Sequence, residues 1–360
     1  MDLERVNAIL AEWGEPAYRG RQVYEAVTRE LVDRYDAITA LPVRLRRRLA
    51  ESEPLLQLEQ VERQLSDDGT VKLRFATRDG FPVEAVAMKH RDRRTVCVSS
   101  QSGCPLACTF CATGSMGLGR NLAAGEIAEQ VTVLAAMLRE EGERVSNVVM
   151  MGMGEPFLNY DAVLAACRTL NDPAGFGLGA RQIAISTAGW VPGIERLAAE
   201  PLQVKLALSL HAPNDRLRTE LMPITRRFPL AKLIAACRGY RDVTRRRIFV
   251  EYLMLDGIND SDRLAEQLAD LLGRDGFHVN LIAYNPTGSD YRASSSTRVA
   301  GFAAVLERRG ISASYRRSHG QDIDAACGQL AVKGASELRR KRARDRRSAA
   351  HAAAQPGVRR

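Results

Sequence analysis

The sequence predicts an α/β protein whose main part is a series of six strand–helix units. From Thr95 onward, short apolar segments alternate with segments of helical pattern, which is typical of parallel βαβ units. The strands are expected at "TVCVSS", "NVVMMG", "QIAIST", "VKLALSL", "IFVEYLM" and "VNLIAYN". Units of this kind over residues 91–335 form an open sheet or a partial (β/α)6 barrel.

Residues 1–54 have a helical pattern instead. In the first segment the apolar side chains recur on one helix face, and a glycine follows them: Leu3, Val6, Ile9, Leu10, Trp13 and then Gly14. Two further short helices are expected at 21–31 and 41–51. The sequence therefore predicts a small N-terminal helical domain.

Between these parts, residues 55–90 have the pattern of a β extension. Two Asp-Gly pairs, at 68–69 and 79–80, separate segments rich in Val, Leu and Phe, which is a strong hairpin signal. We expect three short antiparallel strands, with Glu84 on the third.

Composition and charge narrow the class of protein. The chain has 360 residues, of which 45% are hydrophobic and 26% charged, as in ordinary globular proteins. No apolar run approaches the roughly 20 residues of a membrane span, and charges at Asp2, Glu4 and Arg5 do not suit a signal peptide. We expect a cytoplasmic monomer with reduced cysteines, which serve as ligands or reactive groups rather than disulfides.

The net charge of +9 is concentrated at the C-terminus. Residues 336–360 hold nine Arg or Lys against two acidic residues, a net charge of +7. Such a run is either a disordered, solvated tail or an arm that binds nucleic-acid phosphates. A second basic group near the N-terminus favours nucleic acid: Arg44, Arg46, Arg47 and Arg48.

Three of the seven cysteines lie in a short loop after the first strand of the series. Cys104, Cys108 and Cys111 have the spacing C-x3-C-x2-C. A structural zinc site needs four ligands, and the next histidine, His211, is about a hundred residues further on. Three thiolates instead suit three corners of a [4Fe–4S] cluster and leave one iron open to another molecule.

Polar and small residues gather just after the predicted strands. They are Gly152 to Pro156, Ser186-Thr187, Ser209-Leu210-His211 and Asn285-Pro286. Sites in parallel α/β folds form at the carboxyl ends of the strands. Gly and Pro in these positions are also explained as turn residues, whereas Glu155, His211 and Asn285 are less well explained in that way.

Taken together, the motifs resemble the RlmN/Cfr family of RNA adenosine methyltransferases, within the radical S-adenosylmethionine (SAM) superfamily. The resemblance runs in order from about residue 15 to 331. The matching stretches are "CVSSQSGCPLACTFCATG", "GLGRNL", "NVVMMGMGEP", "ISTAG", "LALSLHAPND", "YLMLDGIND", "IAYNP" and "DIDAACGQL".

The resemblance implies two cofactors. Cys104, Cys108 and Cys111 would bind one [4Fe–4S] cluster, and the amino and carboxylate groups of SAM would bind its open iron. Gly154 and Glu155 would contact the methionyl end of SAM. The rest of the SAM site would be lined by Ser186, Ser209, Leu210, His211 and Asn285. Two SAM molecules would be consumed per methylation, one as methyl donor and one as source of a 5′-deoxyadenosyl radical.

The resemblance also implies covalent catalysis in two stages. Cys327 would carry the methyl group as S-methylcysteine and then become linked to the RNA. Cys97 would release the RNA by attacking the sulfur of Cys327, which leaves a transient disulfide. Glu84 would be the proton acceptor. Without the resemblance, each of these cysteines reads as a small buried side chain, as we expect for Cys167 and Cys237.

The implied substrates are an adenosine of the 23S rRNA peptidyl transferase centre and the adenosine 3′ of the anticodon in certain tRNAs, methylated at C2. An electron donor such as flavodoxin or ferredoxin would reduce the cluster, and the N-terminal domain would help bind RNA. The Cfr type, which methylates C8 of the same rRNA adenosine, shares these motifs. A non-catalytic RNA-binding protein stabilised by zinc is the alternative from another class.

Overall fold

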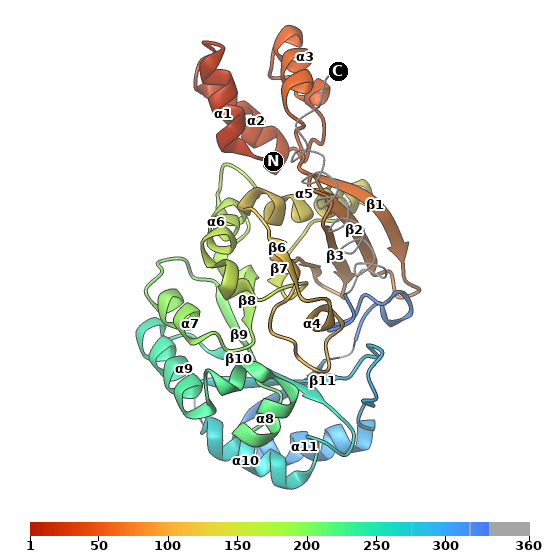
Figure 1. Ribbon diagram of the computed structural model, residues 1–360, viewed down its shortest axis with the longest axis vertical. Coiled ribbons are helices and arrows are strands. Elements are labelled where there is room, and N and C mark those ends of the chain that lie inside the picture. Colours follow the sequence, from red (N-terminus) through yellow and green to blue (C-terminus); the bar gives the residue numbers. More distant parts are fainter. Residues whose placement is uncertain (275, 317, 331–360) are drawn as a thin grey trace, which may run out of the picture.

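The computed structural model describes residues 1–274, 276–316 and 318–330. It shows a small helical part at one end of the molecule and a larger part in which helices surround a long sheet (Figure 1). The basic tail expected at 336–360 lies outside the described residues.

The N-terminal part folds around a hydrophobic core of its own. Its helices are α1 (Leu3–Glu12), α2 (Tyr18–Thr28), η1 (Tyr35–Ala37) and α3 (Val43–Ser52), as the apolar spacing predicts. Asp2 caps α1 by accepting from the N–H of Arg5. Val6, Leu10, Val23 and Leu49 are buried between these helices.

Three antiparallel strands follow, in the positions that the Asp-Gly pairs predict. They are β1 (Leu58–Leu65), β2 (Val71–Thr77) and β3 (Pro82–Lys89). Gly69 and Gly80 end the turns with positive φ angles of 81° and 73°, a conformation that favours glycine. Strand β3 pairs with β4 (Arg94–Cys97), so the extension continues into the main sheet.

The main sheet is parallel from β4 onward. Its further strands are β7 (Asn147–Met150), β8 (Ile183–Thr187), β9 (Lys205–Ser209), β10 (Ile248–Met254), β11 (Phe277–Ala283) and β12 (Ser312–Arg316), in that spatial order. All six expected strands are present, and the α/β class is confirmed. Strand β12 was not predicted, because "SASYR" is short, mostly polar and not fully buried.

Helices connect the parallel strands and cover the sheet (Figure 1). The longer ones are α5 (Ala124–Glu140), α6 (Tyr160–Asn171), α7 (Val191–Ala198), α9 (Leu230–Thr244), α10 (Asp262–Leu272) and α11 (Ser296–Arg308). The shorter elements are α4 (Ala112–Met116), α8 (Asp215–Leu221), η2 (Pro156–Asn159), η3 (Ala180–Gln182), η4 (Pro223–Arg226), η5 (Gln321–Ile323) and a ribbon of β5 (Gln101–Gly103) and β6 (Leu118–Asn121). The expected packing of Cys167 and Cys237 is confirmed, since both are buried in helices of this layer.

A buried carboxylate connects the helical part to the sheet. Glu129 of α5 is only 1% exposed, and it accepts from the N–H groups of Gln57 (2.8 Å) and Leu58 (2.6 Å). It also accepts from the amine of Met1 at 2.5 Å. Glu129 therefore fixes the segment through which the chain passes from α3 into β1.

We expect Glu129→Ala to lower the free energy of unfolding by about 3 kcal/mol, because two buried N–H groups lose a charged acceptor. Urea unfolding followed by circular dichroism measures this. Glu140→Ala, at an exposed position of the same helix, is the control and should stay within about 0.5 kcal/mol of wild type. An equally small effect of Glu129→Ala would contradict the role of this contact.

Candidate functional site

A cavity of about 160 Å³ lies at the carboxyl ends of the parallel strands, where the sequence predicts a site. Most of the predicted cofactor residues line it together: Cys104, Cys108, Cys111, Gly154, Glu155, Ser186, Ser209 and His211. Cys327 lines it as well, from a segment more than two hundred residues after Cys111 in sequence. The fold therefore brings these residues to one place.

The three cysteines lie on a tight loop between β5 and α4. Cys111 N–H donates to Cys108 O (3.2 Å), and Thr109 N–H donates to Leu221 O at the end of α8 (3.0 Å). A Cβ atom on Gly114 would lie only 2.9 Å from Cys108 O, so this position requires glycine. These hydrogen bonds, and the close approach of Gly114 to Cys108, thus hold the loop against the end of α8.

The thiols suit a cluster better than a single metal ion. Among residues 1–274, 276–316 and 318–330, no three His, Cys, Asp or Glu side chains converge closely enough to hold one ion. A cubane instead takes each thiolate on a different iron. Burial raises the pKa of Cys104 to about 12 and also raises that of Cys108, so a bound cluster would displace their protons.

Glu155 is a buried carboxyl group that faces the same cavity. Its two oxygens accept from Phe157 N–H (3.1 Å) and Ala188 N–H (2.7 Å). Burial raises its pKa from 4.5 to about 7, although these N–H groups and the Thr187 hydroxyl oppose the shift. A cationic ligand group would reverse this effect and favour the carboxylate.

Gly154, just before Glu155, allows two loops to approach closely. It has a φ of +106°, and a Cβ atom there would lie 2.7 Å from Gln101 Cβ and 2.8 Å from Ser100 Oγ. Gln101 also accepts from Glu155 N–H at 2.9 Å. The turn after β7 therefore packs directly on the segment after β4.

His211 is fixed in one tautomer and in an unusual backbone conformation. Its φ is +59°, and its backbone oxygen accepts from Asn259 Nδ2 at 2.9 Å. Nδ1 accepts from Leu253 N–H at 3.0 Å, which places the ring proton on Nε2. Burial, and to a smaller extent the charge of Arg218, lowers the pKa of His211 to about 3, so the ring stays neutral. It packs edge-on against Phe110 of the cysteine loop.

Cys97 and Cys327 line a second cavity of about 110 Å³. This cavity adjoins the first, because Cys111, Gly152 and Cys327 line both. Cys97 is buried, and burial followed by the influence of Cys327 raises its pKa to about 12. Cys327 as a residue is exposed, yet protein atoms crowd its thiol, and this desolvation raises its pKa too.

Three predicted site residues line neither of these two cavities. Leu210 is fully buried and offers its backbone oxygen to Arg218. Asn285 instead donates to the backbone oxygen of Cys327 at 3.2 Å. Glu84 is 4% exposed on β3, where Lys72 Nζ lies 4.0 Å from its Oε1.

Two charged residues at this site were not predicted from the sequence. Glu251 of β10 lines the first cavity, accepts from Asn280 Nδ2 (2.8 Å) and lies 3.6 Å from Arg316 Nη1. A single carboxylate inside the apolar segment "IFVEYLM" is a signal that could have revealed it. Arg218 of α8 is fully buried, and its sequence neighbours give no such signal.

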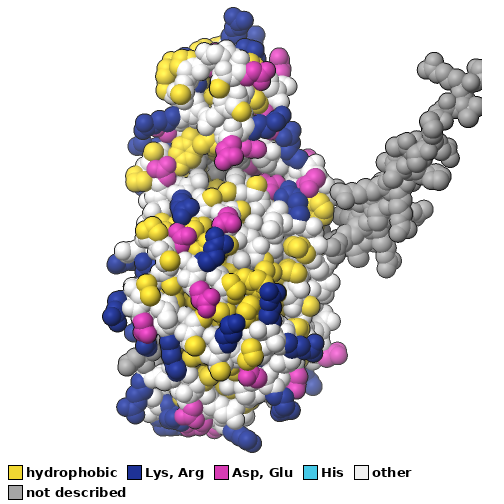
Figure 2. Space-filling model, turned by 60° about the vertical axis from the view of Figure 1, so that its left-hand side comes forward, with side chains coloured by type: hydrophobic (Ala, Val, Ile, Leu, Met, Phe, Trp, Pro, Cys, Tyr) yellow, Lys and Arg dark blue, Asp and Glu magenta, His cyan; other side chains and the backbone are white. Residues whose placement is uncertain are grey.

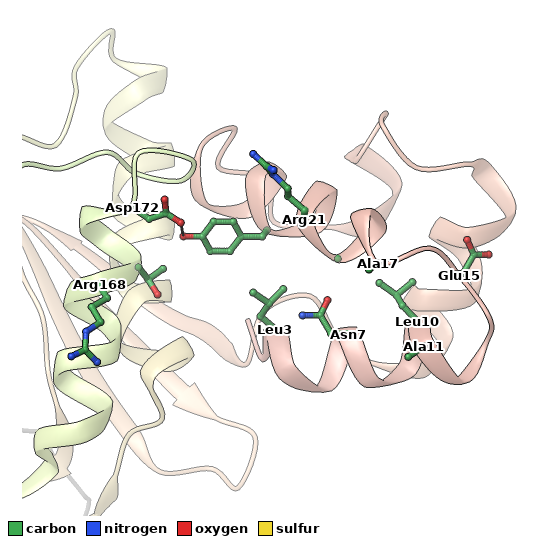
Figure 3. A pocket seen from close by; sticks show the side chains of 12 residues that line it. Leu3, Asn7, Leu10, Ala11, Glu15, Ala17, Arg21, Arg168 and Asp172 are labelled. Carbon is green, nitrogen blue, oxygen red and sulfur yellow. Dashed lines mark hydrogen bonds between the residues drawn. The ribbon is translucent and has the colours of Figure 1, made fainter.

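A larger cavity, of about 940 Å³, lies elsewhere, between α1, α2 and α6. In Figure 3, Arg21, Asn7 and Leu3 lie on one side of it and Asp172 and Arg168 on the other, and the hydroxyl of Tyr24 donates to Asp172 at 2.8 Å. None of its lining residues is a cysteine or a histidine. The smaller cavity is the candidate site, because the reactive side chains converge there.

Comparisons with known proteins identify the family of the chain. The family model of the Radical SAM superfamily matches residues 98–271. Two relatives are named "Probable dual-specificity RNA methyltransferase RlmN". That of Symbiobacterium thermophilum is 47% identical over 92% of this chain and 90% of its own. That of Chloroflexus aurantiacus is 48% identical over 92% of this chain and 91% of its own.

Among solved structures, a radical SAM methyltransferase from Sphaerobacter thermophilus superposes with a TM-score of 0.89. It is 50% identical and covers 92% of this chain and 98% of its own. Identity at this level over nearly the whole length establishes the family, and with it a need for SAM, a [4Fe–4S] cluster and an RNA substrate. The chain belongs to the RlmN family of radical SAM RNA methyltransferases.

Proposed function

We propose that this protein methylates C2 of an adenosine in the 23S rRNA peptidyl transferase centre and of the adenosine 3′ of the anticodon in tRNAs. One observation supports this most directly. The three-cysteine loop, the Gly154-Glu155 turn and Cys327 line one cavity, and Cys97 lies in the cavity next to it. A cysteine beside a cofactor site is what methylation through a covalent protein intermediate requires.

The residues of the first cavity fit the two cofactors that the family implies. Cys104, Cys108 and Cys111 would hold the cluster. Glu155 would accept from an N–H of the amino group of SAM, and the hydroxyls of Ser186 and Ser209, which lie 3.5 Å apart, would contact its ribose. Leu210, His211 and Asn285 would complete the site, His211 as an Nε2–H donor. When bound, cluster and SAM together supply the radical chemistry that an unreactive ring carbon requires.

Two cysteines and a carboxylate would do the covalent and proton chemistry. Cys327 would carry the methyl group on its sulfur and form the bond to the RNA base. Cys97 would attack that sulfur, so that the carbon leaves with its electron pair and a Cys97–Cys327 disulfide forms. Glu84 would take the proton from the ring carbon. Lys72 links Glu84 to the loop of Cys327, because it also donates to Asp324 O at 3.3 Å.

RNA would be held mainly through its phosphates. Lys and Arg side chains are spread over the whole length of the face in Figure 2 rather than gathered in one patch. In the helical part, Arg46 donates to Asp36 O (2.7 Å) and Arg48 stacks on Trp13 (3.8 Å), whereas Arg44 and Arg47 are exposed. We therefore propose Arg44 and Arg47 as phosphate contacts of an N-terminal RNA-binding domain, residues 1–54.

The electron donor, the compartment and the oligomeric state complete the proposal. We propose that a one-electron donor such as flavodoxin or ferredoxin reduces the cluster, and that the protein acts as a cytoplasmic monomer. In the part of the chain that the structure describes, no helix combines the length and the apolar character needed to cross a bilayer.

C8 methylation of the same rRNA adenosine, as in the Cfr type, is the second candidate, since both reactions need the same cofactors and cysteines. The test is mass spectrometry of nucleosides from rRNA and tRNA of a deletion strain, with and without the gene restored. We expect the deletion strain to lack 2-methyladenosine and the restored gene to bring it back. Persistence of 2-methyladenosine, or loss of 8-methyladenosine instead, would contradict the C2 assignment.

We expect Cys97→Ala to accumulate a covalent protein–RNA adduct, because the thiol that releases the RNA from Cys327 is missing. Denaturing gels with and without nuclease treatment detect the adduct. Cys327→Ala should give none, and Cys167→Ala is the matched control for loss of a buried thiol far from the cavities. If Cys97→Ala gives no nuclease-sensitive adduct while Cys327 still becomes methylated, Cys97 does not have this role.

The raised pKa of Glu155 predicts a pH-dependent stability of the cofactor-free protein. The folded state holds this proton up to pH about 7, and the unfolded state releases it near pH 4.5. The stability that protonation contributes is therefore present below pH 4.5 and lost as the pH rises through about 7. Glu155→Gln cannot ionise and should therefore not show this pH-dependent loss of stability.

Between pH 5 and 8, wild type should lose on the order of 3 kcal/mol more unfolding free energy than Glu155→Gln. Urea unfolding at several pH values measures the two slopes. Glu195→Gln, at an exposed position of α7, is the control and should follow wild type. Parallel curves for wild type and Glu155→Gln would show that Glu155 does not titrate in this range.

A further inference from the structure

The guanidinium group of Arg218 is buried behind residues that line the cofactor site, and its hydrogen bonds all go to neutral oxygens. The residue has an exposed fraction of 0%. Nε donates to Leu210 O (3.1 Å), and Nη1 donates to Thr225 Oγ1 (2.9 Å). Nη2 donates to Ala188 O (2.7 Å) and Ser209 O (3.2 Å). All the acceptors in these four bonds are carbonyl or hydroxyl oxygens.

Within residues 1–274, 276–316 and 318–330, no carboxylate forms an ion pair with Arg218. Asp215, on the same helix, accepts from Leu230 N–H instead (2.7 Å). The charge of Asp215 still favours the ionised form of Arg218, but the effect of burial on the pKa of Arg218 is larger. A buried charge without a partner of opposite sign in contact with it is costly, even when its hydrogen bonds are made. The arrangement therefore fits a site that gains negative charge when its cofactor is bound.

The negative charge would come from the cysteine loop. Nη2 of Arg218 binds the backbone oxygens of Ala188 and Ser209, and both of these residues line the same cavity as Cys108. The connection is also mechanical, because Leu221, at the end of the same helix, accepts from Thr109 N–H at 3.0 Å. Helix α8 thus both anchors the cysteine loop and carries the buried cation.

We propose that Arg218 is a positioning residue of the cofactor site, whose fixed positive charge stabilises the one-electron-reduced form of the thiolate-bound cluster. This inference rests on the proposed cluster at Cys104, Cys108 and Cys111. Reduction adds one negative charge, and a cation at short range in a poorly polarisable interior favours that charge far more than a cation in water. Charge near a cluster is one of the factors that set its reduction potential.

A purely structural role is the competing explanation. Arg218 holds the segments after β8 and β9, which carry the Ala188 N–H that binds Glu155 and the residue His211. Loss of these bonds alone would disturb SAM binding and stability. Loss of the hydrogen bonds alone would not systematically lower the reduction potential of an assembled cluster, whereas loss of a nearby positive charge would.

The experiment compares Arg218→Met and Arg218→Gln, which remove the charge, with Arg218→Lys, which keeps it but loses part of the hydrogen bonding. After cluster reconstitution, a redox titration followed by electron paramagnetic resonance gives the potential. Arg216→Met is the matched control, because Arg216 lies on the same helix and its side chain is 86% exposed.

We expect each neutral variant to shift the oxidised-to-reduced ratio about tenfold toward the oxidised form, which for one electron is a potential lower by about 59 mV. Arg218→Lys should stay within about threefold of wild type, and Arg216→Met should not differ from it. Assembled clusters with the wild-type potential in Arg218→Met or Arg218→Gln would overturn the proposal.

If both neutral variants fail to fold, Arg218→Lys decides the question. A potential near that of wild type supports the fixed charge, and a tenfold shift despite the retained charge overturns it. A wild-type protein that assembles no cluster would contradict the proposed function instead, so the two failures are distinguishable.

Discussion

The site depends on the hydrogen bonds of one buried serine in the segment that follows β4. Ser99 Oγ donates to Glu84 O (2.6 Å) and accepts from Met153 N–H (2.9 Å), while its backbone exchanges two hydrogen bonds with the side chain of Gln130. These bonds join β3, helix α5 and the turn after β7. Because the cysteine loop continues from this segment and Glu155 lies two residues after Met153, the distance between the three-cysteine loop and the Gly154-Glu155 turn is fixed here.

The site next to this junction has two buried ionisable groups, Glu155 in the cavity and Arg218 behind it, whose charges the protein alone compensates poorly. Burial raises the pKa of Glu155 to about 7 and lowers that of Arg218 to about 10. Each shift shows that the surroundings disfavour the charged form. A cationic ligand with an amino group, such as SAM, and a cluster of negative charge would supply both missing partners. The same groups that weaken the empty protein thus favour the loaded one.

The sequence allowed most of the fold and part of the site to be predicted. Strong apolar periods identified six parallel strands, and the spacing of Cys104, Cys108 and Cys111 identified the loop. Strand β12 was missed, because its side chains are mostly polar and its place depends on pairing with β11. Arg218 was missed because nothing in "NDRLRTEL" shows that the second arginine turns inward while Arg216 faces solvent. Local sequence carries periodicity, whereas burial of a single charge is decided by tertiary contacts.

The position of Glu84 constrains how a proton acceptor on β3 could act. Val86 lies opposite Cys97 in the strand pair, so Glu84, two residues earlier, is on the same face of the sheet as Cys97. It is nevertheless almost fully buried and does not line either cavity around Cys327. Lys72 contacts both Glu84 and the backbone of Asp324, three residues before Cys327. An RNA base in the cavity would therefore not contact Glu84 in this arrangement. A movement of the Cys327 segment that opened a path to Glu84 would break the contact of Lys72 with Asp324. Lys72 would in this way couple movement of the Cys327 segment to access to Glu84.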